Sequence, residues 1–410
     1  MRHPSTLARM IPWAALALVL VALPFIFPSR TALTLMNVIG INAVFALSYN
    51  MLLGQTGMLS FGHAVYYGLG GFATIHLIAA IKSMGLPIPA PLTPLMGFMG
   101  GMLAGAIIGS FSCRRAGTPF AMISLGVGEL IAAAGLMFRG LFGGEEGVSG
   151  DRTAGPILLG LKLGGPFQVY WVIAVWFFIA AFAMWAFTRT PLGRLANAVR
   201  DNPDRVEFIG FDPQRVRYLV FMISGGFAGL AGGMAALNFE IITPESLSAF
   251  PSAAVLISTF IGGVTLFYGP IIGALFLTLM SSMLSDYTQA WQFYVGGVFV
   301  LMVMFAPGGF AGMVEKARFK FLYNSWDWIL PRLARGAGAA VALGLGAMLL
   351  IEIIVRWRFS GRPLRFLGLE FSHQSILAWI LALGLVALGL WIVRMIRASG
   401  SEELKGSAVR

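Results

Sequence analysis

The chain has 410 residues, of which 58% are hydrophobic and 11% are charged, and its formal net charge is +11. A soluble domain carries about a quarter charged residues, so this composition excludes an ordinary soluble enzyme or binding domain. The basic residues are spread over many short loops and accompany no nucleic-acid-binding motif, so nucleic acid is not an expected partner. Apolar runs of about 20 residues, long enough to cross a bilayer, recur along the chain and predict an all-α integral membrane protein in contact with lipid.

The apolar runs are separated by charges, prolines and glycines and predict about 10 transmembrane helices, some of them broken at glycines or re-entrant. These helices are expected near 10–28, 32–53, 64–82, 94–113, 118–138, 169–188, 216–238, 251–267, 269–285 and 290–306. The region 251–285 is also compatible with a re-entrant segment. Two later runs, near 336–355 and 374–393, predict an additional C-terminal pair of helices.

This pattern divides the chain into three parts. Residues 1–31 form an N-terminal cytoplasmic tip and the first span, residues 32–314 form the membrane core, and residues 315–410 form an extension with two spans. If the N-terminus lies inside, alternation of the spans places 15 Lys and Arg residues on the cytoplasmic side and 5 outside, up to residue 335. Basic residues concentrate on the cytoplasmic side of membrane proteins, so the charges support a multi-pass protein of the bacterial inner membrane in this orientation.

A polar stretch punctuated by glycines, Gly54 to His63, separates the second and third spans. A continuous helix is not expected there, and helices broken at membrane depth form substrate sites in transporters. The sequence therefore predicts a substrate pathway that uses the side chains of Gln55, Thr56, Ser60 and His63. The alternative is a tight cytoplasmic turn whose polar groups only satisfy one another.

A carboxylate, Glu129, is predicted about midway along the fifth span. Such a group costs at least about 2.5 kcal/mol in the bilayer unless it is paired, protonated or hydrated. Together with Ser124, it is a second candidate for the substrate pathway, and the alternative is a structural hydrogen bond to a neighbouring helix. A later break at Gly262-Gly263 and Gly269-Pro270 mirrors the early one, and interrupted segments in both halves indicate a central binding site.

Two further features concern the source of energy. The chain has no Gly-x-x-x-x-Gly-Lys-Ser/Thr phosphate loop, no His/Cys metal cluster and no nucleophile motif. The sequence therefore predicts a protein that is not an enzyme, with no catalytic residue, no metal and no cofactor of its own.

The inner loop 189–217 mixes six Arg with four acidic residues, which favours a docking surface for another protein over a merely solvated loop.

The order of these motifs resembles the permeases of branched-chain amino acid ABC transporters, in particular the LivM-like branch. Most of residues 33–314 takes part. The motifs that carry the resemblance are Gly54 to His63, Gly117 to Met122 with Ser124, Leu125 and Glu129, Gly143 to Gly150, Thr190 to Arg194, Ala198 to Asn202, Glu207 to Gly210, Ser224-Gly225, Gly229 to Gly232, Pro244, Gly262-Gly263, Gly269-Pro270 and Phe305 to Pro307.

The resemblance implies a subunit that works with a second homologous permease, two cytoplasmic ATPases that bind the ATP, and a periplasmic solute-binding protein. It also implies that the segment from Thr190 to Gly210 couples the ATPases to the membrane helices. The residues assigned to coupling are Gly193, Arg194, Arg200, Asp201, Glu207 and Gly210. Branched-chain amino acids are the expected substrates, and urea, amides and aromatic acids are alternatives. The rival interpretation is an ion-coupled secondary transporter in which Glu129 and His63 relay protons.

Overall fold

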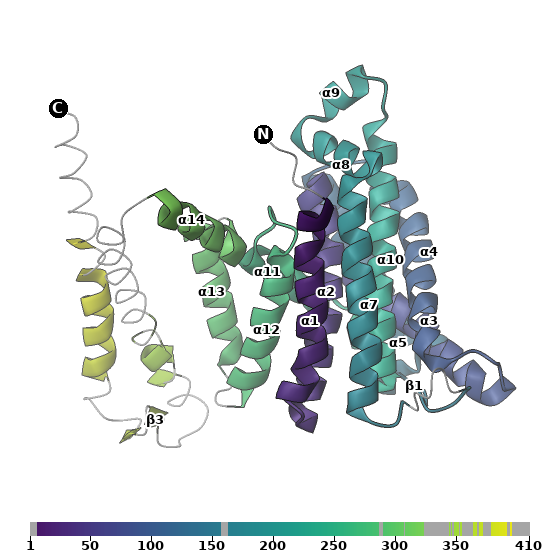
Figure 1. Cartoon of the computed structure of the whole chain (residues 1–410), viewed down its shortest axis with the longest axis horizontal. Coiled ribbons are helices and arrows are strands. Elements are labelled where there is room, and N and C mark those ends of the chain that lie inside the picture. The colour runs from purple at the N-terminus through teal and green to yellow at the C-terminus, as the bar shows by residue number, and fades with distance from the viewer. Residues whose placement is uncertain are drawn as a thin grey trace. The chain divides into compact units, whose positions relative to one another are not determined.

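The computed structural model describes residues 6–156, 163–286, 290–306 and 308–323, and shorter stretches between 344 and 395. The described chain is built almost entirely of helices, which confirms the predicted all-α fold (Figure 1). The helices are α1 Thr6–Ile26, α2 Arg30–Thr56, α3 Ala64–Met84, η1 Ala90–Leu92, α4 Pro94–Ser112, α5 Thr118–Met137, α6 Arg139–Phe142, η2 Gly144–Glu146, α7 Pro166–Arg189, α8 Pro191–Asp201, α9 Pro203–Phe208, α10 Pro213–Phe239, η3 Pro244–Leu247, α11 Ala249–Gly262, α12 Gly269–Ser285, α13 Trp291–Phe305 and α14 Gly309–Tyr323. The strands are β1 Val148–Ser149, β2 Ile241–Ile242, β3 Leu364–Phe366 and β4 Leu369–Phe371.

Within the described residues, six helical segments are long and apolar enough to cross a membrane. They are α2, α3, η1 with α4, α5, α7 and α10. The prediction of a helix over 251–267 was wrong at its end: α11 stops at Gly262, because Gly263 adopts φ +110°, which closes the helix. At 14 residues α11 is about 21 Å long, too short to cross the hydrocarbon core of about 30 Å. This length fits the re-entrant alternative for that region.

The chain forms two compact units, and the first comprises residues 1–279 and 301–312. Its central helix is α10, whose membrane-spanning window is 83% buried. Glycines make this burial possible: a Cβ on Gly229 would overlap the backbone of Gly97 in α4, and one on Gly232 would overlap the carbonyl oxygen of Tyr67 in α3. Small residues of this kind let helix backbones approach closely in membranes.

Helix α1 is held against α7 by aromatic side chains. Trp13 of α1 packs edge-on against Phe178, Phe182 and Trp185 of α7, with ring centroids 5.2 to 5.8 Å apart. The Tyr170 hydroxyl of α7 also donates to the carbonyl oxygen of Leu20 at 2.7 Å. The predicted first span is therefore part of the helical bundle.

The connection between α5 and α7 lies at the end of the bundle opposite α8 and α9 (Figure 1). Its described residues are rich in glycine, which disfavours a long helix, and they form the short α6 and η2 and the strand β1, which pairs antiparallel with β2. Asp151 in this connection accepts hydrogen bonds from Thr153 and from Lys82, whose Nζ is 3.1 Å away. These donors, Thr153 first, lower the pKa of Asp151 to about 2, so its carboxylate stays ionised at any physiological pH.

Arg152 fixes this outer connection to the end of α10. Its guanidinium donates to the carbonyl oxygens of Leu163 at 2.7 Å and Asn238 at 2.8 Å, and its Nε lies 3.9 Å from the Glu240 carboxylate. A cation beside the last carbonyls of a helix is favourable, because those groups have no partner within the helix.

Replacing Arg152 with alanine is therefore expected to loosen the connection locally. Hydrogen bonds that involve a charged group are worth about 1.5 to 3 kcal/mol, so the amide hydrogens of Gly150 and Arg152, which bond to Glu240, should exchange at least about tenfold faster. Hydrogen exchange followed by mass spectrometry measures this. The matched control is Arg139→Ala, since the Arg139 side chain is exposed in the same connection; equal exchange in both variants would contradict the anchoring role.

The second compact unit comprises residues 280–300 and 313–410. Of the predicted C-terminal pair, an apolar helix over Trp379–Trp391 is described, and much of the span 336–355 lies outside the described residues. Leu349 and Ile353 pack against Ala382, and the Tyr294 hydroxyl donates to the carbonyl oxygen of Met348 at 3.3 Å. β3 and β4 pair antiparallel. The predicted boundary of the extension at residue 315 stays a prediction.

Candidate translocation site

Helix α2 ends at a break between it and α3. Gly57 adopts φ +69°, the left-handed conformation that closes a helix and that glycine adopts without strain, and its N–H bonds back to Leu53. The helix extends three residues beyond the predicted end at 53, so Gln55 and Thr56 belong to its last turn. The following backbone is not helical until Ala64.

The break lies inside the bundle and is held by two other helices. The backbone N–H of Phe61 donates to Ser124 Oγ of α5 at 3.1 Å, and the N–H of Ala64 donates to Ser252 Oγ of α11 at 2.8 Å. Ser124 is six residues after the start of α5, about 9 Å along its axis. Irregular backbone at this depth is tolerated only where protein or water satisfies it, and here serine side chains do so.

Two of the predicted pathway residues, Ser60 and His63, are buried at the break, with exposures of 0% and 1%. His63 Nε2 lies 3.0 Å from Ser48 Oγ, and that hydroxyl donates to the carbonyl oxygen of Phe45 at 2.7 Å. We therefore assign the proton of a neutral His63 to Nε2, which leaves Nδ1 as an acceptor. Within the described chain, Nδ1 and the Ser60 hydroxyl have no hydrogen-bond partner.

The other predicted residues do not join this cluster. The Thr56 hydroxyl donates to the carbonyl oxygen of Leu52 in its own helix, and Gln55 Oε1 accepts from Asn197 Nδ2 of α8 at 3.0 Å. Glu129 is exposed on α5, where it lines a separate hollow. The structure thus brings Ser60, His63 and Ser124 to the break, while Gln55 contacts α8 and Thr56 bonds within α2.

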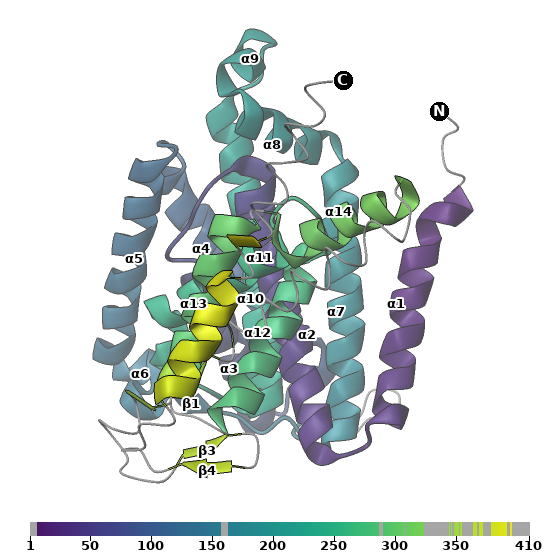
Figure 2. The ribbon, with the colours of Figure 1, turned by 90° about the vertical axis from the view of Figure 1, so that its left-hand side faces the viewer.

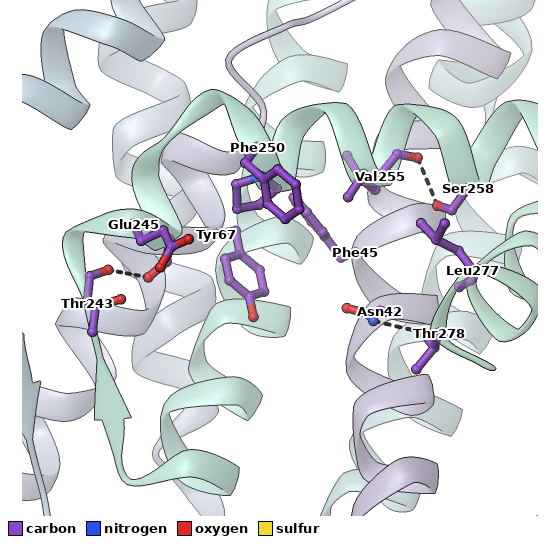
Figure 3. Close-up of a pocket in the computed structure, with 14 residues that line it drawn as sticks. Asn42, Phe45, Tyr67, Thr243, Glu245, Phe250, Val255, Ser258, Leu277 and Thr278 are labelled. Atoms are coloured by element: carbon purple, nitrogen blue, oxygen red, sulfur yellow. Dashed lines mark hydrogen bonds between the residues drawn. The ribbon is translucent and has the colours of Figure 1, made fainter. Parts of the chain in front are cut away.

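Two adjoining hollows of the first unit meet at the η3 connection. The outer hollow, about 500 Å³, is lined by Glu129 of α5, Glu145 of η2 and Glu245 of η3. The inner cavity, about 270 Å³, lies between α2, α3, α11 and α12 and also reaches Glu245 (Figure 3). No Lys or Arg is among the described residues that line either space, so both favour solutes that carry positive charge.

Sequence reasoning missed Glu245 and the lining residues Asn42, Tyr67 and Thr243. One signal for Glu245 was present: it is an ionisable residue beside a proline, in a short connection between two apolar runs. No pattern along the chain marks Tyr67 or Asn42, because they come from different helices and meet only after folding.

The predicted coupling loop forms two short helices, α8 and α9, at one end of the bundle (Figures 1 and 2). Thr190 begins α8 by accepting the Gly193 N–H at 3.1 Å, and Ala196 and Val199 pack on Val216 of α10. The remaining residues assigned to coupling are exposed along this surface: Arg194, Arg200, Asp201, Glu207 and Gly210.

Arg200 joins α8 directly to the end of α2. Its guanidinium donates to the carbonyl oxygen of Gly54, its side-chain carbons lie against Gly57, and its Nη2 is 3.0 Å from the Asp201 carboxylate. With the bond from Asn197 to Gln55, the two helices share two polar contacts. These contacts join α8 to the last turn of α2, immediately before the break.

Sequence reasoning also missed exposed apolar residues beside this predicted coupling loop. Phe208, Ile209 and Phe211 at the end of α9 are 90%, 63% and 48% exposed. A hollow of about 690 Å³ beside them is lined by Asp204, Glu207 and Arg217, among others. Exposed aromatic residues beside charged ones are typical of protein interfaces.

The bundle of long apolar helices, the broken helix and the charged helix pair at one end define a multi-pass membrane permease. The chain belongs to the family described as branched-chain amino acid transport system / permease component, whose model matches residues 31–307. It is a protein of the bacterial inner membrane.

Individual relatives agree with this assignment. The high-affinity branched-chain amino acid transport system permease protein LivM of Escherichia coli is 26% identical, over 76% of this chain and 77% of its own length. The permease protein LivH of the same type of system in Salmonella typhimurium is 25% identical, over 67% and 92%. The autoinducer 2 import system permease protein LsrC of Shigella flexneri is 25% identical, over 56% and 66%. No solved structure matches the chain.

Proposed function

We propose that the chain is the permease subunit of an ABC importer that carries branched-chain or related amino acids across the inner membrane, with ATP hydrolysed on separate subunits. The observation that carries this proposal is the contact of Arg200 and Asn197 in α8 with the end of α2. A membrane helix that ends on an exposed, charged helix pair is suited to receive motion from a protein outside the membrane. An ion-coupled carrier has no need of such a surface.

The exposed face of α5 is the proposed site of the second, homologous permease. Met122, Leu130 and Met137 on this helix are 69% to 77% exposed, and Glu129 on the same helix lines the outer hollow. Pairing on this face would enclose that hollow between two permeases. Similarity to both LivM and LivH, two permease proteins of one type of system, supports a partner of this kind. A periplasmic solute-binding protein would deliver the solute to the outer hollow.

Reconstitution in vesicles tests the proposal. The complete complex, with both ATPases, the second permease and the binding protein, is expected to accumulate labelled leucine only when ATP is present on the ATPase side. A complex whose ATPases lack the phosphate-binding lysine is the control and should accumulate none. Accumulation by this chain alone, against a gradient and without nucleotide, would show the rival ion-coupled carrier.

A further inference from the structure

The inner cavity has a polar end and an apolar wall that come from different elements of the first unit (Figure 3). Glu245 and Thr243 belong to the connection that follows α10, and Tyr67 belongs to α3. The apolar wall includes Phe45 of α2, Val255 of α11 and Leu277 of α12. A space of about 270 Å³ has room for a small solute.

Free polar atoms face this cavity. Asn42 Nδ2 donates to Thr278 Oγ1 at 2.9 Å, which leaves the Asn42 carbonyl oxygen available. Within the described chain, the Tyr67 hydroxyl has no hydrogen-bond partner, and Figure 3 shows it pointing into the space between α3 and α2. A half-buried hydroxyl without a partner is able to donate to a bound acceptor, and a solute carboxylate is such an acceptor.

Charge restricts the solute further. Glu245 is the one carboxylate or cationic group among the described residues that line the cavity. An anion without a positive group is repelled there, whereas an ammonium group gains a charge-assisted hydrogen bond. Phe45 and Val255, which are 5% and 3% exposed, offer a dry surface to an aliphatic side chain.

We propose that this cavity is a substrate-binding site for a zwitterionic aliphatic amino acid. The ammonium group lies at Glu245, the carboxylate accepts from the Tyr67 hydroxyl, and the branched side chain packs on Phe45, Val255 and Leu277. This inference rests on the proposed importer function and narrows its substrate class, because it disfavours aromatic and other acids that lack an amino group. Glu245 also lines the outer hollow, so a solute reaches the cavity from that side.

Thiol protection tests occupancy without relying on transport. The chain has one cysteine, Cys113, which is 1% exposed. A thiol reagent is therefore expected to label only the engineered cysteine. Ser246→Cys places a thiol in the cavity, and Ser248→Cys places a matched thiol in the outer hollow only. Saturating leucine is expected to slow labelling of the first variant by a small thiol reagent about fivefold or more. The second variant should be unaffected, and 4-methylpentanoate, which lacks the amino group, should protect neither.

Glu245→Gln, combined with Ser246→Cys, tests the role of the carboxylate. Loss of a charge-assisted hydrogen bond is expected to raise the leucine concentration needed for half-maximal protection about tenfold or more. Glu145→Gln, which changes a carboxylate of the outer hollow only, is the matched control and should leave that concentration unchanged. Leucine that protects neither thiol, or protection unchanged by Glu245→Gln, would overturn the proposal. If the wild-type complex accumulates leucine with ATP in either case, the importer function stands and only the cavity is excluded.

Discussion

An importer that carries Arg200→Ala is expected to assemble normally and to keep most of its ATP hydrolysis, but to lose at least about tenfold in leucine uptake. Arg200 connects α8 with the carbonyl oxygen of Gly54 and lies against Gly57, where α2 breaks. A cation at this position also complements the negative end of the helix dipole. Without the guanidinium, movement of α8 no longer pulls on the end of α2. ATP is then hydrolysed without a matching uptake of leucine.

The ratio of ATP hydrolysed to leucine imported distinguishes this from simple destabilisation. Arg200→Lys retains one donor and is expected to restore a large part of the uptake, whereas Arg139→Ala on the outer connection should change neither rate. Asn197→Ala removes the second contact, to Gln55, and should have a smaller effect in the same direction because that bond is uncharged. An unchanged ratio in Arg200→Ala would exclude this route of coupling.

The membrane character and the break after α2 could be predicted from the sequence, because both depend on local properties. Apolar runs of sufficient length must be helical in lipid, and Gly57 permits the left-handed conformation that ends α2. The charged segment was also recognisable, since its residues are contiguous, although it was predicted as a loop and the structure forms the helices α8 and α9 there. The contact of Arg200 with Gly54 was not, because the two are 146 positions apart and no residue pattern specifies which carbonyl the guanidinium reaches.

The surroundings of the predicted substrate-pathway residues could not be predicted from the sequence either. Ser60 and His63 were selected as polar residues in an apolar region. The structure buries both, and His63 lies among the rings of Phe45, Tyr49 and Tyr66. A polar residue in a span either faces a solute or completes a packed core, and composition does not separate these outcomes. The inner cavity depends instead on how η3, α11 and α12 approach α2 and α3, which is a property of tertiary packing. Whether Ser60 and His63 contact substrate stays a prediction.

The packing of α10 against α3 leads to the other large expected effect. Replacing Gly232 with valine should abolish accumulation of folded protein in the membrane, because a Cβ at this position would overlap the carbonyl oxygen of Tyr67 and lie 3.0 Å from the backbone nitrogen of Gly71. Both obstacles are backbone atoms of α3, so no side chain is able to rotate away. The helices would have to separate along their length, at a cost of about 3 kcal/mol or more.

Gly126→Val is the matched control, because Gly126 also lies in a membrane helix, α5, and no atom comes within 4 Å of its Cβ position. Size-exclusion chromatography of fluorescently tagged protein in detergent measures both variants against the wild type. We expect Gly126→Val to elute as the wild type does and Gly232→Val to be lost as aggregate.

Because Tyr67 also lines the inner cavity, a milder change, Gly232→Ala, should shift this residue and weaken leucine protection of the thiol at position 246 even where the protein still folds. Normal elution and normal protection in both Gly232 variants would mean that α10 and α3 do not approach as closely as their backbones indicate.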